Sequence, residues 1–271
     1  MLATAVIVFR ETLEAALVVS IIMAASYGVV HRGLWVWSGV AAGALGACVV
    51  ALFAGAITTA VEGIGQELLN ASILILAVLM LGWHSVWMAH HGRELAREMG
   101  EVGHAVAAGH QPLYALAIAA GMALLREGSE TVLFLYGIAS SGDGGLMHLL
   151  VGGLLGGAAG VIFGLLLYRG LLIIPMRHLF AVTNVMILLL TAGLAAQAAG
   201  FLVQADLIPS LGGPVWDTSH VLSEDSLVGK VLHSLIGYQS RPEGIQVLCY
   251  AIVLSTLTLL TFLTGSRTKT R

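Results

Sequence analysis

Two copies of one charged motif, R-E-x-x-E, lie within long apolar segments and constrain how the chain can fold. The first copy occupies residues 10–14 and the second residues 126–130. An ionised side chain at the centre of a membrane helix costs about 2.5–3.5 kcal/mol. The charged side chains of both copies must therefore face one another, water or a bound ion.

The composition places the chain in a membrane. Of its 271 residues 58% are hydrophobic and 10% are charged, and the mean hydropathy is +0.94, whereas soluble domains are about 25% charged. Helices that cross about 30 Å of hydrocarbon need about 20 mostly apolar residues. Suitable runs lie near 2–27, 35–58, 69–89, 113–138, 149–168, 178–203 and 246–264. We therefore expect an all-α integral membrane protein with seven transmembrane helices.

The spacing of the motif predicts an inverted repeat. The two copies lie in the first and fourth apolar runs, so each unit has three spans. Because three is odd, the second unit crosses the membrane in the opposite sense, as in many transporters. The predicted organisation of the single membrane domain is a first repeat at 1–89, a cytoplasmic connection at 90–112, a second repeat at 113–203, an external loop at 204–245, and a seventh helix with a cytoplasmic tail at 246–271.

Basic residues set the expected orientation. Eight of the twelve Lys and Arg residues fall on one side of the predicted spans, namely Arg32, Arg93, Arg97, Arg169, Arg177, Arg267, Lys269 and Arg271. Since cytoplasmic loops carry the excess of basic residues, the N-terminus is expected outside and the C-terminus in the cytoplasm.

The predicted external segments are acidic. Five of their carboxylates are candidates to collect cations before transport, namely Glu62, Glu67, Asp217, Glu224 and Asp225. A negative surface raises the local concentration of cations. The alternative is that acidic external loops are simply what the placement of basic residues on the other side leaves behind.

The two motif copies carry the residues for a metal site. The glutamates of each copy are three residues apart and project from one helix face. The predicted ligands are Glu11, Glu14, Glu127 and Glu130. Carboxylates suit hard cations, and Fe³⁺ is a natural extension of that set. Arg10 and Arg126 each lie four residues before the second glutamate and can keep it ionised without a cation.

Several alternatives remain open from the residues alone. Both motifs could be ion pairs that lock two helices together, or carboxylates of a proton relay. The cargo could be another divalent cation, and a membrane-embedded metal-dependent oxidoreductase is a further class. His84 could join the metal path, although a lone buried histidine is more often simply hydrogen-bonded.

The paired motifs in a seven-span frame resemble the high-affinity iron permeases of the oxidase-dependent type. W-D-T-S at 216–219 and the G-Y and R-P pairs at 237–238 and 241–242 look like the last external loop of that family. Thr12 departs from the family, in which glycine is common, whereas Gly128 keeps it. The resemblance covers essentially the whole chain.

The resemblance implies a transporter and no enzyme activity. It implies iron import across the plasma membrane, as Fe³⁺ or Fe²⁺, through the four matched glutamates, and no permanently bound cofactor. The short loops and the small size indicate a bacterial inner-membrane protein. It also implies a separate periplasmic or extracellular protein that oxidises or delivers iron. Iron ions and membrane lipid are the other expected partners, and no nucleic acid is expected.

Overall fold

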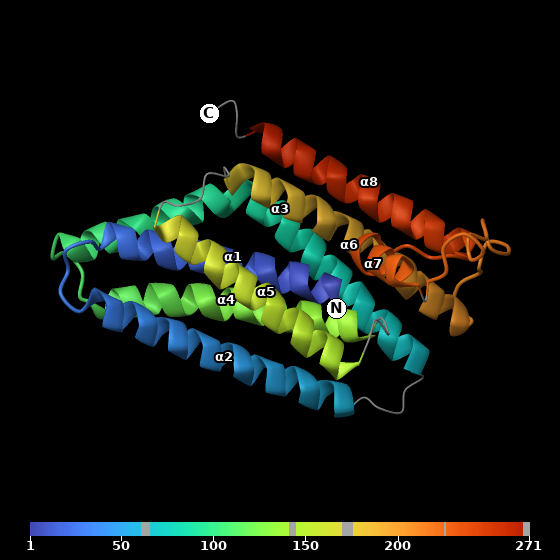
Figure 1. Cartoon of the computed structure of the whole chain (residues 1–271), viewed down its shortest axis with the longest axis horizontal. Helices are drawn as coiled ribbons and strands as arrows, with labels where there is room; N and C mark the ends of the chain where they lie inside the picture. Colours follow the sequence, from blue (N-terminus) through green and yellow to red (C-terminus); the bar gives the residue numbers. More distant parts are fainter. Residues whose placement is uncertain (61–65, 141–144, 170–175, 225, 268–271) are drawn as a thin grey trace.

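Seven long helices and one short helix make up the structure, a computed structural model that describes residues 1–60, 66–140, 145–169, 176–224 and 226–267. The helices are α1 (Leu2–Ala25), α2 (Arg32–Ala60), α3 (Gln66–Ala107), α4 (Tyr114–Ser140), α5 (Leu146–Tyr168), α6 (Met176–Gln204), α7 (Leu227–Ile236) and α8 (Gly244–Arg267). Consecutive long helices run in alternating directions, so α1 and α4 are antiparallel (Figure 1).

Five helices contain segments that are long and apolar enough to cross a membrane. These segments are Arg32–Ala54, Glu67–Met88, Leu146–Leu166, Ala181–Gln204 and Gly244–Leu263. The chain is therefore a helical membrane protein. Helices α1 and α4 have comparable lengths of 24 and 27 residues, but they are not among these five helices. Each of them carries the three charged residues of one motif copy.

Each motif helix packs most extensively on the second helix of the other half of the chain. Helix α5 lies along α1, and α2 lies along α4. Glycines allow this close approach: a Cβ built on Gly152 would lie 2.5 Å from the Met1 oxygen, and one on Gly43 would lie 2.5 Å from the Gly121 oxygen. Small residues at membrane helix interfaces let backbones pack closely.

The departure at Thr12 is accommodated by a glycine on the facing helix. A Cβ built on Gly160 would lie 2.7 Å from the Thr12 Cβ. At the matching position of the second copy, a Cβ on Gly128 would lie 2.6 Å from the Ala47 Cβ. The glycine thus lies on α5 where α1 and α5 meet, and on the motif helix α4 where α2 and α4 meet. Each of these two contacts leaves room for only one larger side chain.

Helix α3 continues well beyond the third apolar run. It has 42 residues and extends through most of the expected connection at 90–112 before a turn leads into α4. No proline occurs in this stretch before Pro112, and Arg97 lies 3.6 Å from Glu94 and 3.7 Å from Glu101. Such i, i+3 and i, i+4 pairs support a solvated helix. The connection is therefore largely an extension of α3.

The segment between α6 and α8 packs around the short helix α7, at the end of the bundle opposite the C-terminal end of α8 (Figure 1). Ser226 caps α7 by accepting a hydrogen bond of 3.0 Å from the Gly229 nitrogen. Gly237 ends the helix with φ +69°, in the left-handed region that favours glycine. A Cβ built on Gly193 of α6 would lie 2.6 Å from the Gly237 Cα, so α7 is held directly against α6.

Candidate metal site

Both copies of the motif lie in the interior, where α1 and α4 approach each other. Glu11, Glu14 and Glu127 are exposed by only 1%, 5% and 2%. The side chain of Glu130 is 18% exposed. The structure therefore brings the four predicted glutamates into one buried region, although the two motif copies are more than a hundred residues apart in the sequence.

The first copy pairs its own charges. Arg10 Nε lies 2.9 Å from Glu14 Oε1, and Arg10 Nη1 lies 3.8 Å from Glu11 Oε1. Among the residues that the structure describes, neither carboxylate oxygen of Glu11 has a hydrogen-bond partner, and Glu14 Oε2 also lacks one. Buried polar atoms are normally hydrogen-bonded. These oxygens are therefore available to a ligand.

The second copy is more open. Arg126 Nε donates to Glu130 Oε1 at 3.2 Å, and the guanidinium group lies 4.1 Å from the ring centre of Trp87. Arg126 and Glu130 also line a cavity of about 560 Å³ between α3 and α4, which Trp83 and Trp87 border. No local sequence pattern indicates that Trp87 contacts the Arg126 guanidinium, because the contact joins distant segments of the chain.

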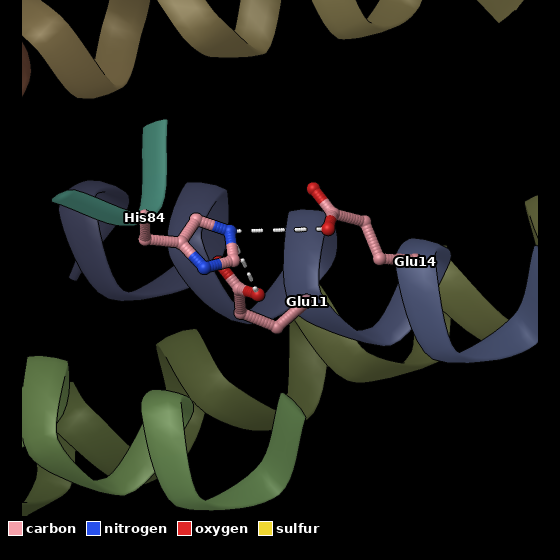
Figure 2. Close-up of side chains that lie close together, drawn as sticks. All are labelled: Glu11, Glu14 and His84. Carbon is pink, nitrogen blue, oxygen red and sulfur yellow. Dashed lines mark ion pairs between the residues drawn. The ribbon is translucent and has the colours of Figure 1, made fainter. Parts of the chain in front are cut away.

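His84 of α3 is buried and lies beside Glu11 and Glu14 of the first copy (Figure 2). Its Nε2 atom is 3.9 Å from Glu11 Oε2 and 3.8 Å from Glu14 Oε2. Its Nδ1 atom contacts Glu130 Oε2, on the other side of the ring. The imidazole therefore faces a carboxylate of each copy, and the ring is only 4% exposed.

Two groups of side chains in the described part of the chain are close enough to share a metal ion. One consists of Glu11, Glu14 and His84, and the other of Glu11, Glu127 and Glu130; within each group the candidate ligand atoms lie within 4.8 Å of one another. Glu11 belongs to both groups. Carboxylate oxygens with one imidazole can bind divalent and trivalent transition-metal ions.

Apolar clusters lie on both sides of the glutamates along the helices. The cluster toward the α7 end consists of Ala3, Ile7, Leu74, Leu81, Phe134, Ile138, Ile187, Leu190, Leu194 and Ala198. The cluster toward the other end consists of Val18, Ile22, Val36, Val106, Leu116 and Ala120. The charged side chains are thus enclosed along the helix axes by closely packed apolar residues.

The predicted capture residues that the structure describes are not part of the buried site. Glu67 is exposed at the start of α3, whereas Glu62 and Asp225 lie outside the described residues. Glu224 accepts a hydrogen bond from the Ser240 nitrogen. Among the described residues, neither Glu67 nor Glu224 belongs to a group close enough to share an ion.

Asp217 is engaged in an ion pair at the protein surface. Arg241 Nη2 lies 2.8 Å from Asp217 Oδ2, and the Ser219 hydroxyl and backbone nitrogen both donate to Asp217 Oδ1. The hydrogen bond from Arg241 is the main cause that holds the pKa of this carboxyl well below its usual range, and the bonds from Ser219 add to it. Asp217 thus remains ionised, with its charge offset by Arg241.

Paired glutamates in the interior of a helical membrane protein are typical of the class of membrane transporters that move ions. Residues 1–266 match the Iron permease FTR1 family, and the chain belongs to this family. It is 34% identical to the ferrous iron permease EfeU of Escherichia coli O6:H1 over 92% of this chain and 90% of that protein. It is 33% identical to the protein of the same name from Yersinia pestis over 95% and 92% of the two chains. No solved structure matches the chain significantly.

Proposed function

We propose that the chain imports iron ions across the plasma membrane through a site formed by Glu11, Glu14, Glu127 and Glu130. One observation carries the proposal: these glutamates converge from two antiparallel helices in the interior, with buried oxygens that lack hydrogen-bond partners among the described residues. Membership of an iron permease family supports iron as the cargo.

The charge balance favours a multivalent cation. The four carboxylates outnumber the guanidinium groups of Arg10 and Arg126, so the ionised site is negative. Uncompensated buried charge costs several kcal/mol per ion. The arginines offset part of this cost when no cation is bound, and an iron ion would offset the remainder. A site that served only to lock two helices together would not need surplus negative charge.

We further propose that α1 and α4 also span the membrane, which gives seven spans in an inverted repeat of three plus three helices with α8 as the extra one. The packing of the helices supports the repeat, because the first helix of each half lies along the second helix of the other half: α1 along α5, and α4 along α2. The connections that follow α1 and α3 lie at the same end as the C-terminus (Figure 1).

The orientation follows from the basic residues at that end. Arg32 begins α2 there and donates to the Met23 oxygen at 3.0 Å, and Arg97 lies on the extension of α3. This end would face the cytoplasm, since cytoplasmic segments carry more basic residues. The N-terminus and the segment around α7 would then face outside.

The enclosure of the glutamates implies that transport needs helix movement. Ile7 and Phe134 are exposed by 0% and 1%, and both lie between the glutamates and the α7 end. An iron ion cannot pass through such packing without rearrangement. In the proposed mechanism the apolar clusters open in turn, so that the ion reaches the glutamates from outside and leaves toward the cytoplasm.

Uptake of radioactive iron into liposomes that contain the purified full chain tests the proposal. Glu14→Gln and Glu130→Gln preserve size but remove one carboxylate each, and we expect either to abolish uptake. Glu101→Gln is the matched control, because Glu101 is an exposed glutamate on α3. Wild-type uptake in both site variants would contradict the proposal. Parallel runs under reducing and oxidising conditions would identify the transported oxidation state.

The proposal includes a separate protein outside the membrane that oxidises or delivers iron, as the family resemblance implies. If delivery is obligatory, liposomes with wild-type protein alone take up little free iron, and uptake rises when the partner is added. The Glu14→Gln comparison then has to be made with the partner present. Full uptake by the wild-type chain alone would contradict an obligatory partner.

A further inference from the structure

We infer that His84 is a direct metal ligand, which completes a site with Glu11 and Glu14 and makes it select borderline divalent transition metals over hard cations. The inference rests on the proposed function and deepens it, because it assigns a nitrogen ligand and a class of preferred ion to the same buried region. The sequence motif itself contains only carboxylates and an arginine, so it gives no reason to expect this preference.

The first argument is distance. His84 Nε2 lies 3.9 Å from Glu11 Oε2 and 3.8 Å from Glu14 Oε2. Divalent transition metals bind nitrogen and oxygen ligands at about 2.0–2.2 Å. Two ligands on one ion can therefore be up to about 4.2 Å apart. An ion between the ring and the two carboxylates thus fits with only small side-chain movements (Figure 2).

The second argument is the contact on the far side of the ring. His84 Nδ1 contacts Glu130 Oε2 from the second motif copy. Histidine ligands usually donate their other ring N–H to a carboxylate, which fixes the tautomer and directs the free nitrogen at the metal. With Nδ1 protonated toward Glu130, the lone pair of Nε2 points to Glu11 and Glu14. Glu130 would then act as a positioning residue for His84 besides its role in the second group of carboxylates.

The third argument is the environment of the ring. His84 is 4% exposed, and its Nε2 atom has no hydrogen-bond partner among the described residues. A histidine that serves only packing would be expected to satisfy its ring nitrogens with backbone or hydroxyl groups. Phe134 lies edge-on to the ring at a centroid distance of 6.1 Å and limits its rotation.

The chemical consequence concerns selectivity. Imidazole suits iron, cobalt, nickel, copper and zinc, whereas sites built only from carboxylates also suit magnesium, calcium and manganese. One nitrogen ligand therefore lets the site discriminate against Mg²⁺ and Ca²⁺. The site with Glu11, Glu14 and His84 would accordingly prefer Fe²⁺ to the hard divalent ions.

Equilibrium binding of Co²⁺ and Mn²⁺ to the purified full chain tests the inference. Co²⁺ is the probe for a borderline ion, and Mn²⁺ for an ion that prefers oxygen. We expect His84→Gln to weaken Co²⁺ binding by about 10–100-fold, a typical loss when a metal site is disturbed. Mn²⁺ binding should change by less than about threefold, because the glutamine supplies an amide oxygen. His104→Gln, an exposed histidine on the same helix, is the control and should change neither.

X-ray absorption of one equivalent of bound Co²⁺ gives a readout that does not depend on any variant. The wild-type chain and His104→Gln should show imidazole scattering around cobalt, and His84→Gln should lack it. Absence of imidazole scattering in the wild type would overturn the inference even if His84→Gln failed to fold.

Glu14→Gln separates this inference from the proposed function. If Glu14→Gln loses Co²⁺ while His84→Gln binds it like the wild type, the glutamate site stands and the histidine ligand is wrong. If Glu14→Gln retains full Co²⁺ binding, the glutamate site is itself wrong, and the inference fails with it.

Discussion

Arg10 and Glu14 form a salt bridge of 2.9 Å in which both side chains are at most 5% exposed. The matching pair of the second copy, Arg126 and Glu130, is 3.2 Å long, with side chains 31% and 18% exposed. The two copies thus share the R-E-x-x-E motif, but their charged side chains lie in different environments. The first is enclosed, whereas the second borders a cavity between α3 and α4.

This difference predicts unequal effects on stability. Removal of one partner from a buried pair leaves an uncompensated charge and costs about 3–5 kcal/mol. We expect Arg10→Gln to destabilise the protein by that amount, and Arg126→Gln by less, because its pair is only partly buried. Thermal unfolding of both variants in the same detergent measures the difference. Equal losses in the two variants would contradict it.

A second prediction concerns the contact between α1 and α5. A Cβ on Gly156 would overlap the backbone of Ala5, whereas nothing lies within 4 Å of a Cβ on Gly153. Gly156→Val should force the two helices apart, with a loss of at least about 1–3 kcal/mol, and leave little folded protein. Gly153→Val is the matched control on the same helix and should fold normally. Size-exclusion profiles of the solubilised variants provide the measurement, and similar profiles for both would refute the packing of α5 on α1.

A third prediction concerns pH. The folded pKa of Asp217 is held below its usual range, mainly by the hydrogen bond from Arg241. A depressed folded pKa contributes stability that is fully present above the unfolded value of about 3.9 and is lost as the pH falls toward the folded value. The Asp217 contribution should therefore be constant from about pH 5 to 8 and decline below about pH 4.

Hydrogen exchange of two nearby amides measures this effect. The Val215 nitrogen donates to the Pro242 oxygen and the Thr218 nitrogen to the Ser240 oxygen, both at 2.9 Å. Their protection factors should follow the ionisation of Asp217, and Asp217→Asn should lower protection at pH 7 and remove the acid-dependent loss. Protection in Asp217→Asn equal to the wild type at pH 7 would show that the ion pair does not stabilise the loop.

A fourth prediction concerns the end of α7. Gly237 has φ +69°, and a Cβ there would collide with the backbone of Gly193. Gly237→Ala combines left-handed strain of about 1–2 kcal/mol with this collision, so α7 should detach from α6. Gly213→Ala lies in open space and should have no such effect. Faster hydrogen exchange in α7 of the first variant alone is the expected result.

The sequence predicted the helices and the shared face of each glutamate pair, because apolar runs and i, i+3 spacing are local properties. Glycines at every fourth residue of α5, from Gly152 to Gly164, are typical of close helix packing, but they do not indicate that α1 is the neighbour. Which helices adjoin depends on contacts between distant segments, which no local pattern encodes.

The same limit applies to the site and the external segment. The role of His84 was left open, because only the fold places it between Glu14 and Glu130. The ion pair between Asp217 and Arg241 was missed for the same reason, because the chain has to fold back to bring the two residues together. The neighbouring hydrogen bond from Trp216 to the Gln239 oxygen likewise joins residues that are 23 positions apart. Composition could predict acidic loops, but not which of their charges are already paired.

The most direct test of the central claim is to locate the ion. An anomalous difference map recorded at the iron edge from crystals of the full chain with Fe²⁺ should show a peak between α1, α3 and α4. The peak should lie about 2.0–2.2 Å from carboxylate oxygens that include those of Glu11, the residue shared by both groups of candidate ligands. Iron peaks only at surface carboxylates such as Glu67, with none at Glu11, would contradict the account.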